Sequence, residues 1–493
     1  MKVIYSVLAI LALGACSNEE LNLKASSVET TSSGERWSEV ETYEGNPTWV
    51  IEIDETETYQ TITGFGGAFT ESTSHLLMKL SPELRAEVLK AYFDSSGCDY
   101  TLCRTHINSS DFSLKSYSYA PVEGDLALAH FSIEEDRDDI IPIIKQAQGI
   151  SQSGFKLIAS PWTAPPWMKD NRAWFGGKLL PEYYSVWGEF FSKYVEAFQS
   201  EGIDIWAVTV ENEPLGNDSH WESMHYTPAE MREFVVNHLS PSFEQHGIDA
   251  KILVYDQNKG AELEEWSEAL LTDSVLKANI YGTAVHWYNS TYDWFPASLQ
   301  RTHELAPNHH IISTEACVDA EVPHWRDDAW YWKKEATDWG WDWASPETKH
   351  YHTKYVPAYR YARDIIGDLN NWVEGWVDWN MVLDRQGGPN HAQNWCIAPV
   401  IADTTLNEVY YTPLYYVIGH FSKFIRPGAV RVALDGYERD GIMTTCFKNE
   451  DGSYALVLLN MTDANMPFEV RLNGQAWRYN LKAESIQTVQ IQN

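Results

Sequence analysis

The sequence predicts a (β/α)8 TIM barrel of parallel strands with an attached all-β sandwich domain. Between residues 61 and 399, short apolar runs alternate with longer helix-like runs, as expected for repeated strand–helix units. After about residue 399 the pattern changes to short alternating segments separated by turn residues. The chain of 493 residues is also long enough for a barrel of roughly 250 to 400 residues and a smaller companion.

Eight apolar, β-branched runs account for the predicted barrel strands. They begin at Ile62 and continue at residues 100–104, 156–160, 205–210, 251–255, 282–286, 310–314 and 373–379. Helix-like patterns fall between several of these runs, at residues 82–92, 133–148, 183–202 and 228–245. Parallel strands need such crossover connections, and the order therefore predicts a closed barrel surrounded by helices.

The sandwich is predicted to be discontinuous in sequence. Its main part spans residues 400–493, where alternating segments occur at 429–433, 441–447, 453–459 and 468–472. An early alternating strand at residues 49–53 precedes the barrel pattern, and we expect residues 37–60 to join the same domain.

The N-terminus predicts a lipid-anchored protein of the bacterial cell envelope, at the outer membrane or the cell surface. Residues 1–15 carry Lys2, an apolar run and a small-residue ending before Cys16, which resembles a lipoprotein signal cleaved just before the cysteine. Residues 16–36 are rich in Ser, Thr and Glu, as expected of a disordered tether. The alternative is an ordinary secretory signal with an incidental cysteine.

Net charge and composition limit the classes of molecule that the protein is expected to bind. The formal net charge of −34 disfavours nucleic acid and anionic lipid, which leaves the anchor at Cys16 as the expected membrane contact. The 22 Trp and 27 Tyr favour ligands with apolar faces such as sugar rings, although most aromatic side chains will lie in the core.

Cysteine, histidine and glycine patterns predict neither a metal nor a cofactor. Cys98 and Cys103 could pair, but Cys317, Cys396 and Cys446 leave an odd count without Cys-x-x-Cys spacing. The histidines at 309–310 and 350–352 lack a recognisable ligand set. The glycines at 64–67 lack the spacing of a nucleotide loop and indicate a loop with close backbone approach at a barrel rim instead.

Two strand-like runs end in a carboxylate. Residues 209–214 carry Glu211 and Glu213, and residues 311–317 carry Glu315. The carboxyl ends of barrel strands converge at one mouth, where two acids suit hydrolysis of a glycosidic bond. Glu211 competes with Glu213, because residues two apart point the same way along an ideal strand.

Other polar and aromatic residues sit where predicted strands end, which is where a barrel keeps its chemistry. They are Arg104, Asp111, Trp162, Asn212, His286, Tyr288 and Trp379.

With these motifs the chain resembles glycoside hydrolase family 30 from about residue 60 to its C-terminus. The matching stretches are Gly64-Phe65-Gly66-Gly67-Ala68, Ser160-Pro161-Trp162-Thr163, Trp206 to Pro214, Ala284-Val285-His286-Trp287-Tyr288, Glu315-Ala316-Cys317-Val318, Asp378-Trp379-Asn380, Gly387-Gly388-Pro389-Asn390 and Gly419 to Ile425. The family fold is a (β/α)8 barrel with a β-sandwich, in agreement with the prediction from the pattern.

The resemblance implies a retaining mechanism with Glu213 as acid/base and Glu315 as nucleophile, and Asn212 on the sugar 2-hydroxyl. It also implies pocket positions around the sugar for Arg104, Asp111, Trp162, His286, Tyr288, Trp379 and Asn394. Purely structural roles are the alternative for three of these: an ion pair for Arg104, core packing for His286 and rim packing for Trp162.

Residue type suggests how the pocket positions act. Asp111 is expected to accept bonds from two hydroxyls and to favour a neutral hexose such as glucose. Arg104 is expected to lower the pKa of the nucleophile. Trp379 suits the floor beneath the sugar ring, and Tyr288 can hydrogen-bond Glu315.

The substrate stays open between glucosylceramide and β-1,6-glucan, because branches of the resembled family cleave both with the same core residues. A Trp-rich stretch at residues 323–355 directly follows the Glu315 strand and is expected at the pocket rim. A noncatalytic carbohydrate-binding lipoprotein is the alternative from another class, against which the presence of both Glu213 and Glu315 argues.

Overall fold

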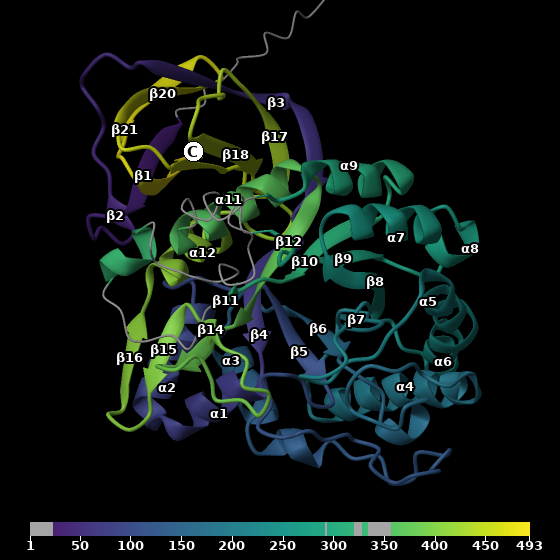
Figure 1. The fold of residues 1–493 in the computed structure, drawn as a ribbon. Coiled ribbons are helices and arrows are strands. Elements are labelled where there is room, and N and C mark those ends of the chain that lie inside the picture. The colour runs from purple at the N-terminus through teal and green to yellow at the C-terminus, as the bar shows by residue number, and fades with distance from the viewer. Residues whose placement is uncertain (1–22, 291–292, 320–327, 334–355) are drawn as a thin grey trace, which may run out of the picture.

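The computed structural model describes residues 23–290, 293–319, 328–333 and 356–493. A barrel surrounded by helices forms the larger part, and a curved sheet packs against one side of it (Figure 1). Within the described ranges, no helix combines the length and apolar character that crossing a membrane requires.

The barrel is closed by eight parallel strands in the order β10-β12-β4-β5-β6-β7-β8-β9, which confirms the predicted (β/α)8 fold. The strands are β4 (Gly64–Phe69), β5 (Leu102–Ile107), β6 (Lys156–Pro161), β7 (Ala207–Thr209), β8 (Lys251–Asn258), β9 (Gly282–His286), β10 (His310–Glu315) and β12 (Val373–Asn380). Every predicted strand run overlaps one of them except the first, where pairing begins at Gly64.

Helices follow the strands around the outside of the barrel. They are α1 (Glu71–Lys79), α2 (Pro82–Phe93), α3 (Ile140–Ile150), α4 (Tyr184–Ser200), α5 (Pro228–Phe234), α6 (Ser240–His246), α7 (Ala261–Leu271), α8 (Ser274–Lys277), α9 (Pro296–Leu305), α11 (Pro357–Asn370) and α12 (Pro413–Ser422). Short 3-10 turns lie at η1 (Glu134–Arg137), η2 (Pro166–Met168), η3 (Pro181–Tyr183) and η5 (Asp328–Trp332), and the π-turn η4 (Val235–Leu239) joins α5 to α6.

One predicted helix starts later than expected. The pattern at residues 133–148 resolves into η1 and then α3, because the side chain of Asp139 accepts the amide of Ile140 and caps the helix there.

The barrel interior is filled by one inward side chain from most strands. This layer consists of Leu102, Ile158, Ala207, Leu253, Ala284, Ile312 and Val377. On β4 a Cβ added at Gly66 would lie 1.9 Å from the carbonyl oxygen of Leu102. The predicted close backbone approach is therefore confirmed, but these glycines lie within the barrel strand β4 rather than in a loop at the rim.

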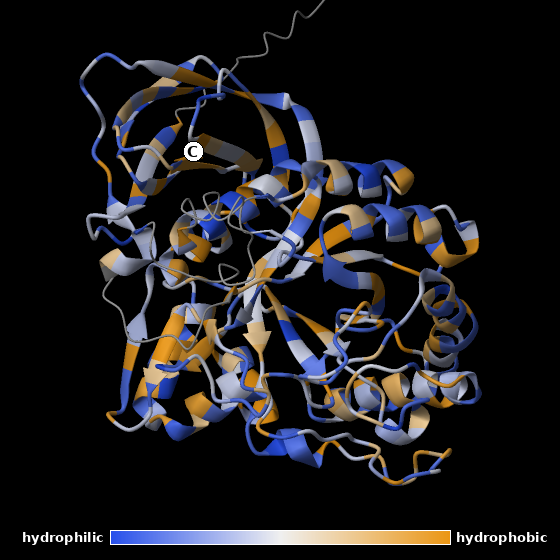
Figure 2. Ribbon diagram, viewed as in Figure 1, coloured by the Kyte–Doolittle hydropathy of each residue, from blue (hydrophilic) through white to orange (hydrophobic). Residues whose placement is uncertain are grey.

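The second part is one nine-stranded sheet that curves around its own apolar core, in the order β2-β1-β22-β19-β18-β17-β3-β20-β21. Its strands are β1 (Lys24–Thr31), β2 (Ser38–Glu39), β3 (Trp49–Thr61), β17 (Val430–Asp435), β18 (Ile442–Lys448), β19 (Tyr454–Asn460), β20 (Met466–Leu472), β21 (Gln475–Leu481) and β22 (Ser485–Gln492). Hydrophobic and hydrophilic residues alternate along these strands (Figure 2). The early strand joins this domain as predicted, because β3 pairs with β17 and β20.

The predicted tether over residues 16–36 is wrong for its second half. Residues 24–31 form β1, which pairs along its whole length with the last strand, β22. Four of its polar side chains are buried, those of Ser27, Glu29, Thr30 and Thr31. Gln487 donates to the hydroxyl of Ser27, and His420 contacts that of Thr30. A composition typical of disorder thus occurs here in a buried strand.

The predicted boundary at residue 400 is also displaced. Residues 382–411 form a small sheet of β13 (Val382–Asp384), β15 (Val400–Asp403) and β16 (Glu408–Tyr411), beside the short pair β11 (Val318–Asp319) and β14 (Cys396–Ile397). The helix α12 then packs against β4, with the rings of Phe65 and Phe421 6.3 Å apart. The all-β domain therefore resumes only at β17.

Candidate active site

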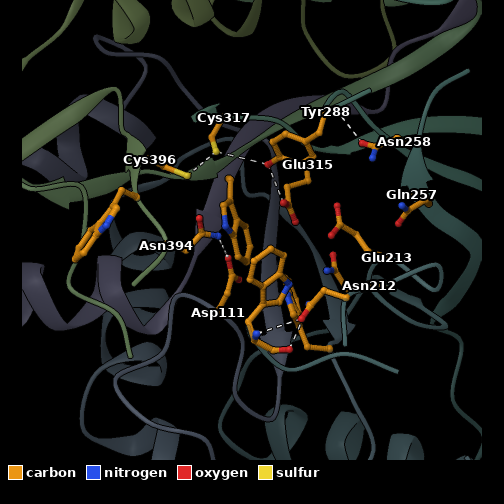
Figure 3. A pocket seen from close by; sticks show the side chains of 16 residues that line it. Asp111, Asn212, Glu213, Gln257, Asn258, Tyr288, Glu315, Cys317, Asn394 and Cys396 are labelled. Atoms are coloured by element: carbon orange, nitrogen blue, oxygen red, sulfur yellow. Dashed lines mark hydrogen bonds between the residues drawn. The ribbon is translucent and has the colours of Figure 1, made fainter. Parts of the chain in front are cut away.

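A pocket of about 450 Å³ opens at the carboxyl ends of the barrel strands (Figure 3). Its lining residues are Asp111, Trp162, Asn212, Glu213, Gly216, Asn217, Trp221, Gln257, Asn258, Tyr288, Glu315, Cys317, Trp379, Asn394, Trp395 and Cys396. Of the sugar-site residues predicted from the sequence, Arg104 and His286 do not line it and lie fully buried behind its wall.

Glu213 and Glu315 face each other in this pocket. One carboxylate oxygen of each, together with a ring nitrogen of His286, lies within 4.8 Å of the others. That separation corresponds to the roughly 5 to 5.5 Å of retaining glycosidases rather than the roughly 6.5 to 9.5 Å of inverting ones.

Glu211 is excluded from the pocket, although simple alternation places it on the same side as Glu213. The strand β7 ends at Thr209, so the period of two does not extend to either glutamate. The backbone of Glu213 turns into the left-handed region with φ 49° and redirects its side chain. Glu211 is fully buried, and burial raises its pKa well above the ordinary value.

Arg104 on β5 lies beneath the pocket and binds several of the side chains around it. Its guanidinium donates to Glu315, to Asn212 Oδ1 at 2.8 Å and to Asp256 Oδ2 at 2.8 Å, and its Nε donates to Ser160 Oγ at 3.0 Å. Burial alone would lower the pKa of Arg104, but the charges of Asp256 and Glu315 outweigh it. The guanidinium therefore stays charged and fixes four side chains from four strands or their ends.

His286 is held between two carboxylates. Its Nδ1 lies 3.3 Å from Glu213 Oε1, and its Nε2 lies 3.0 Å from Asp256 Oδ1. Burial would lower the pKa of His286, but the charges of Glu315 and Asp256 outweigh burial and raise it to about 9. The distances among Glu213, His286 and Glu315 would also suit a metal ion. The imidazolium and the Arg104 guanidinium already supply the positive charge that these acids need.

The carboxyl of Glu315 experiences opposing effects. Burial raises its pKa, while the charges of His286 and Arg104 and the hydroxyl of Tyr288, which donates at 2.8 Å, lower it. Burial is the larger effect, and the net pKa is raised. Arg104 thus acts in the predicted direction, although burial outweighs the nearby charges in the net pKa.

Asp111 lies on the opposite wall from Glu315. Its Oδ2 accepts a hydrogen bond from Asn394 Nδ2 at 2.9 Å, while Oδ1 is buried without a partner in the described part of the chain. Burial, reinforced by the charge of Glu315, raises the pKa of Asp111 well above the ordinary value. Oδ1 is therefore left for a ligand, and a protonated carboxyl can donate as well as accept.

Two tryptophans form an apolar wall over the arginine. The rings of Trp162 and Trp379 stack at 5.0 Å with planes 18° apart. The guanidinium carbon of Arg104 lies 5.0 and 5.5 Å from their centres, within the range of cation–π contact.

Several pocket residues were not predicted from the sequence. Tyr255 and Asp256 both adopt positive φ at a bulge in β8, which turns Asp256 towards Arg104 and His286 and places Gln257 and Asn258 on the pocket wall. The signal was present, because three polar residues directly follow the apolar run at 251–255. Trp221 and Trp395 lie on loops beyond strand ends, where periodicity carries no information.

The Trp-rich stretch at 323–355 lies mostly outside the described residues, including Trp325, Trp339, Trp341 and Trp343. Within the described part, Trp330 packs against the main core, and Trp332 is buried in it.

Two loops around the pocket are joined by His391 and Glu222. The Nε2 of His391 lies 3.2 Å from Glu222 Oε2, and its Nδ1 lies 2.9 Å from the carbonyl oxygen of Ser113. The carboxylate beside Nε2 and the carbonyl oxygen beside Nδ1 favour the protonated ring. Burial alone would lower the pKa of His391, but Glu222 outweighs it and raises the pKa to about 9.

Comparison with known proteins gives a consistent result. Residues 62–425 match the family model for the glycosyl hydrolase family 30 TIM-barrel domain, and residues 428–489 match that for the family 30 beta sandwich domain. The chain is 34% identical over 421 residues to the lysosomal acid glucosylceramidase of Mus musculus, which covers 84% of this chain and 77% of the relative.

Relatives that act on a glucan are also present. The chain is 28% identical over 453 residues to an endo-1,6-beta-D-glucanase of Neurospora crassa, which covers 88% of this chain and 86% of the relative. The solved structure of an endo-β1,6-glucanase has a TM-score of 0.80 and 28% identity, and covers 94% of this chain and 99% of that structure.

The His391 ion pair predicts a pH-dependent stability. Its contribution is complete below the ordinary histidine pKa of about 6.5 and is lost as the pH rises through about 9. We expect His391→Gln to lower the free energy of unfolding at pH 6 by roughly 1 to 2 kcal/mol. The difference from the unmodified protein should shrink towards pH 10 in thermal melts.

His286 titrates in the same range, but it is present in both proteins and cancels in this difference. His130→Gln on the exposed surface is the control and should show only a small effect. A difference for His391→Gln that is constant or grows between pH 6 and 10 would contradict the assignment.

Proposed function

The chain belongs to glycoside hydrolase family 30, and from that premise we propose that its pocket hydrolyses β-linked glucosides with retention of configuration, as a glucosylceramidase-type enzyme. The observation that carries the proposal is the pair of carboxylates of Glu213 and Glu315 at retaining distance in one pocket. A pocket that keeps both acids gives no support to a noncatalytic carbohydrate-binding role.

In the first step, a carboxylate oxygen of Glu315 attacks the anomeric carbon while the bond to the leaving oxygen breaks. Glu213 gives its proton to that oxygen, and a covalent glycosyl-enzyme remains. In the second step, Glu213 takes a proton from water, the water oxygen bonds to the anomeric carbon, and the carboxylate of Glu315 leaves.

The surrounding residues support these roles. Arg104 and Tyr288 each donate to a different oxygen of Glu315, which orients the carboxylate and favours its charged form against the effect of burial. Asn212 is held by Arg104 through its side-chain oxygen. Its amide nitrogen is then left to donate to the sugar 2-hydroxyl, a contact that strengthens in the transition state.

Asp111 and Asn394 bind the hydroxyl groups of the sugar, and Trp379 provides the apolar surface beneath the ring. The unpartnered oxygen of Asp111 suits one sugar hydroxyl. A ligand carboxylate placed beside Asp111 would add to the negative charge of Glu315 and be disfavoured. These features favour a neutral hexose such as glucose over a uronic acid.

A second candidate substrate is β-1,6-glucan, which the amide groups beside Glu213 favour. Asn217, Gln257 and Asn258 line the pocket there, and Gln257 Oε1 is buried without a partner among the described residues. The unpartnered oxygen of Gln257 suits a hydroxyl of a second sugar, whereas Trp221 in the same pocket suits a sugar face or a lipid chain equally.

The lipid anchor and the cell-envelope location belong to the proposal as well. They are supported by the signal-like residues 1–15 before Cys16. Since β1 begins at Lys24, only residues 17–23 would separate an anchor at Cys16 from the folded sheet.

Metabolic labelling tests the anchor. Cells that express the chain with a radiolabelled fatty acid should incorporate label into the unmodified protein and not into Cys16→Ser, which should also leave the membrane fraction. Cys446→Ser is the control, because that buried cysteine lies in the sheet and should not affect labelling. Equal labelling of the Cys16→Ser protein would contradict the anchor.

Azide rescue tests the two catalytic assignments. With Glu315→Ala, azide entering the vacated face should give the α-glucosyl azide from an activated aryl β-glucoside. With Glu213→Ala, the glycosyl-enzyme still forms, and azide should give the β-glucosyl azide. Natural substrates should lose about a hundred- to ten-thousand-fold in rate in this variant, because general acid help is absent.

Glu211→Ala is the matched control two positions away. It should give neither azide product, and its loss should come from packing of the buried side chain. A β-azide from Glu211→Ala and none from Glu213→Ala would overturn the acid/base assignment.

Comparing natural substrates tests which group is attached to the glucose that the enzyme releases. We expect glucose release from glucosylceramide, and comparison with β-1,6-glucan and β-1,3-glucan shows whether a second sugar is accepted. If Gln257 reads that sugar, Gln257→Leu should lower kcat/KM on β-1,6-linked oligosaccharides by roughly tenfold, the cost of one lost hydrogen bond. Turnover of an aryl β-glucoside should be nearly unchanged. Failure of all three natural substrates alongside aryl glucoside cleavage would refute both candidates.

A further inference from the structure

Two cysteine thiols meet on the pocket wall. The Sγ atoms of Cys317 and Cys396 lie 2.8 Å apart, and both residues are buried and line the pocket (Figure 3). A disulfide bond is about 2.05 Å long, so the two sulfur atoms need to approach by less than about 1 Å to bond.

The backbone pairing around the two cysteines independently places them close together. The strands β11 and β14 pair antiparallel, with Val318 opposite Ile397 and Asp319 opposite Cys396. Cys317 precedes β11 by one residue and is therefore the diagonal neighbour of Cys396 across the pair. The two side chains are held together by a hydrogen-bonded ladder, although 79 positions separate them in the chain.

We propose that Cys317 and Cys396 form a modification site, at which oxidation closes a disulfide that fastens one wall of the pocket. The site goes beyond the hydrolase activity, and bond formation does not depend on the proposed function. The oxidant is a small disulfide, such as glutathione disulfide, that enters through the open pocket.

The exchange balances in two steps. The thiolate of one cysteine attacks the reagent disulfide, which forms a mixed disulfide and releases one reagent thiol. The second cysteine then attacks the protein sulfur of that mixed disulfide, forms the Cys317–Cys396 bond and releases the second reagent thiol. The two cysteines lose two electrons and two protons, and the reagent disulfide is reduced to two thiols.

The other described cysteines do not line the pocket through which the reagent enters, and they are unsuited to this chemistry. Cys98, Cys103 and Cys446 are fully buried thiols, and burial raises the pKa of each, that of Cys98 to about 12. The thiolate is the reactive form, and these three therefore react slowly. The possible pairing of Cys98 with Cys103 raised by the sequence is not present in the structure.

The bond would connect two segments that shape the site. Cys317 lies two residues after Glu315, and Cys396 lies two residues after Asn394, which holds Asp111. The hydroxyl of Tyr288 contacts both Glu315 and Cys317 Sγ, the latter at 3.6 Å. A disulfide would therefore fix the sugar-reading segment relative to the nucleophile segment.

Peptide mapping tests the bond itself. The folded full chain is incubated with glutathione disulfide, alkylated under denaturing conditions, digested without reduction and examined by mass spectrometry. We expect a peptide that links Cys317 to Cys396, is lost after reduction, and is absent from Cys317→Ser and Cys396→Ser. Cys446→Ser should still form it. Glutathione carried separately by either cysteine, or both cysteines recovered only in alkylated form, would overturn the proposal.

Oxidation should also change the melting temperature and KM, which would not change if the two cysteines only packed against each other. Oxidation should raise the melting temperature of the unmodified protein by a few degrees, reversibly, and leave that of Cys396→Ser unchanged. For an aryl β-glucoside, KM should fall a few-fold with little change in kcat, because a fixed wall is preorganised for the sugar. This kinetic arm rests on the proposed function, whereas the linked peptide is detected whether or not the chain hydrolyses glucosides. Identical melting of oxidised and reduced protein would contradict the link.

Discussion

The buried guanidinium of Arg104 is the interaction on which the site depends. A charge that is fully removed from water is tolerated only where opposite charges and hydrogen-bond acceptors surround it, and losing one partner of such a pair costs about 3 to 5 kcal/mol. Asp256 and Glu315 supply the charges, and Asn212 and Ser160 supply further acceptors. The chain must therefore bring four strand ends to one point in order to fold, and the same point is where the glycosidic bond is held. The stacked Trp162 and Trp379 rest on this cation, which places the apolar wall of the pocket under the same constraint.

Much of this arrangement could be predicted because burial on a parallel barrel leaves a regular mark in the sequence. Apolar β-branched runs located the strands, and the polar residues that follow them located Arg104, Asp111 and Glu315. Periodicity could not choose between Glu211 and Glu213, since the choice depends on where β7 stops and on one left-handed residue. Periodicity also could not place Asp256, because this residue lies at a bulge in β8. The balance between burial and nearby charge at Glu315 is a property of three-dimensional packing, and no pattern of residues reports it.

Composition was least informative in the all-β part. The Ser- and Thr-rich residues near the N-terminus resemble a disordered segment, yet their hydroxyls are satisfied inside the protein by Gln487 and His420. His420 lies on α12 and also contacts Thr488 on β22, so one imidazole connects the barrel side to two strands of the sheet. Burial raises the cost of its charged form and lowers the pKa of His420 to about 3, which keeps this connection neutral. Polar residues of this kind are recognised as core only when their partners, distant in sequence, are known.

The pairing of β1 with β22 also constrains the order in which the molecule can assemble. The first strand of the sheet finds its neighbour only in the last strand of the chain, across 461 positions between Ser27 and Thr488. During synthesis, the N-terminal segment therefore emerges long before its partner exists. The barrel lies between them in sequence and can close first, because its strands pair mostly with their immediate successors. Completion of the sheet is then the final folding event. A chain interrupted shortly before its end would have an intact barrel beside an unpaired, aggregation-prone strand edge.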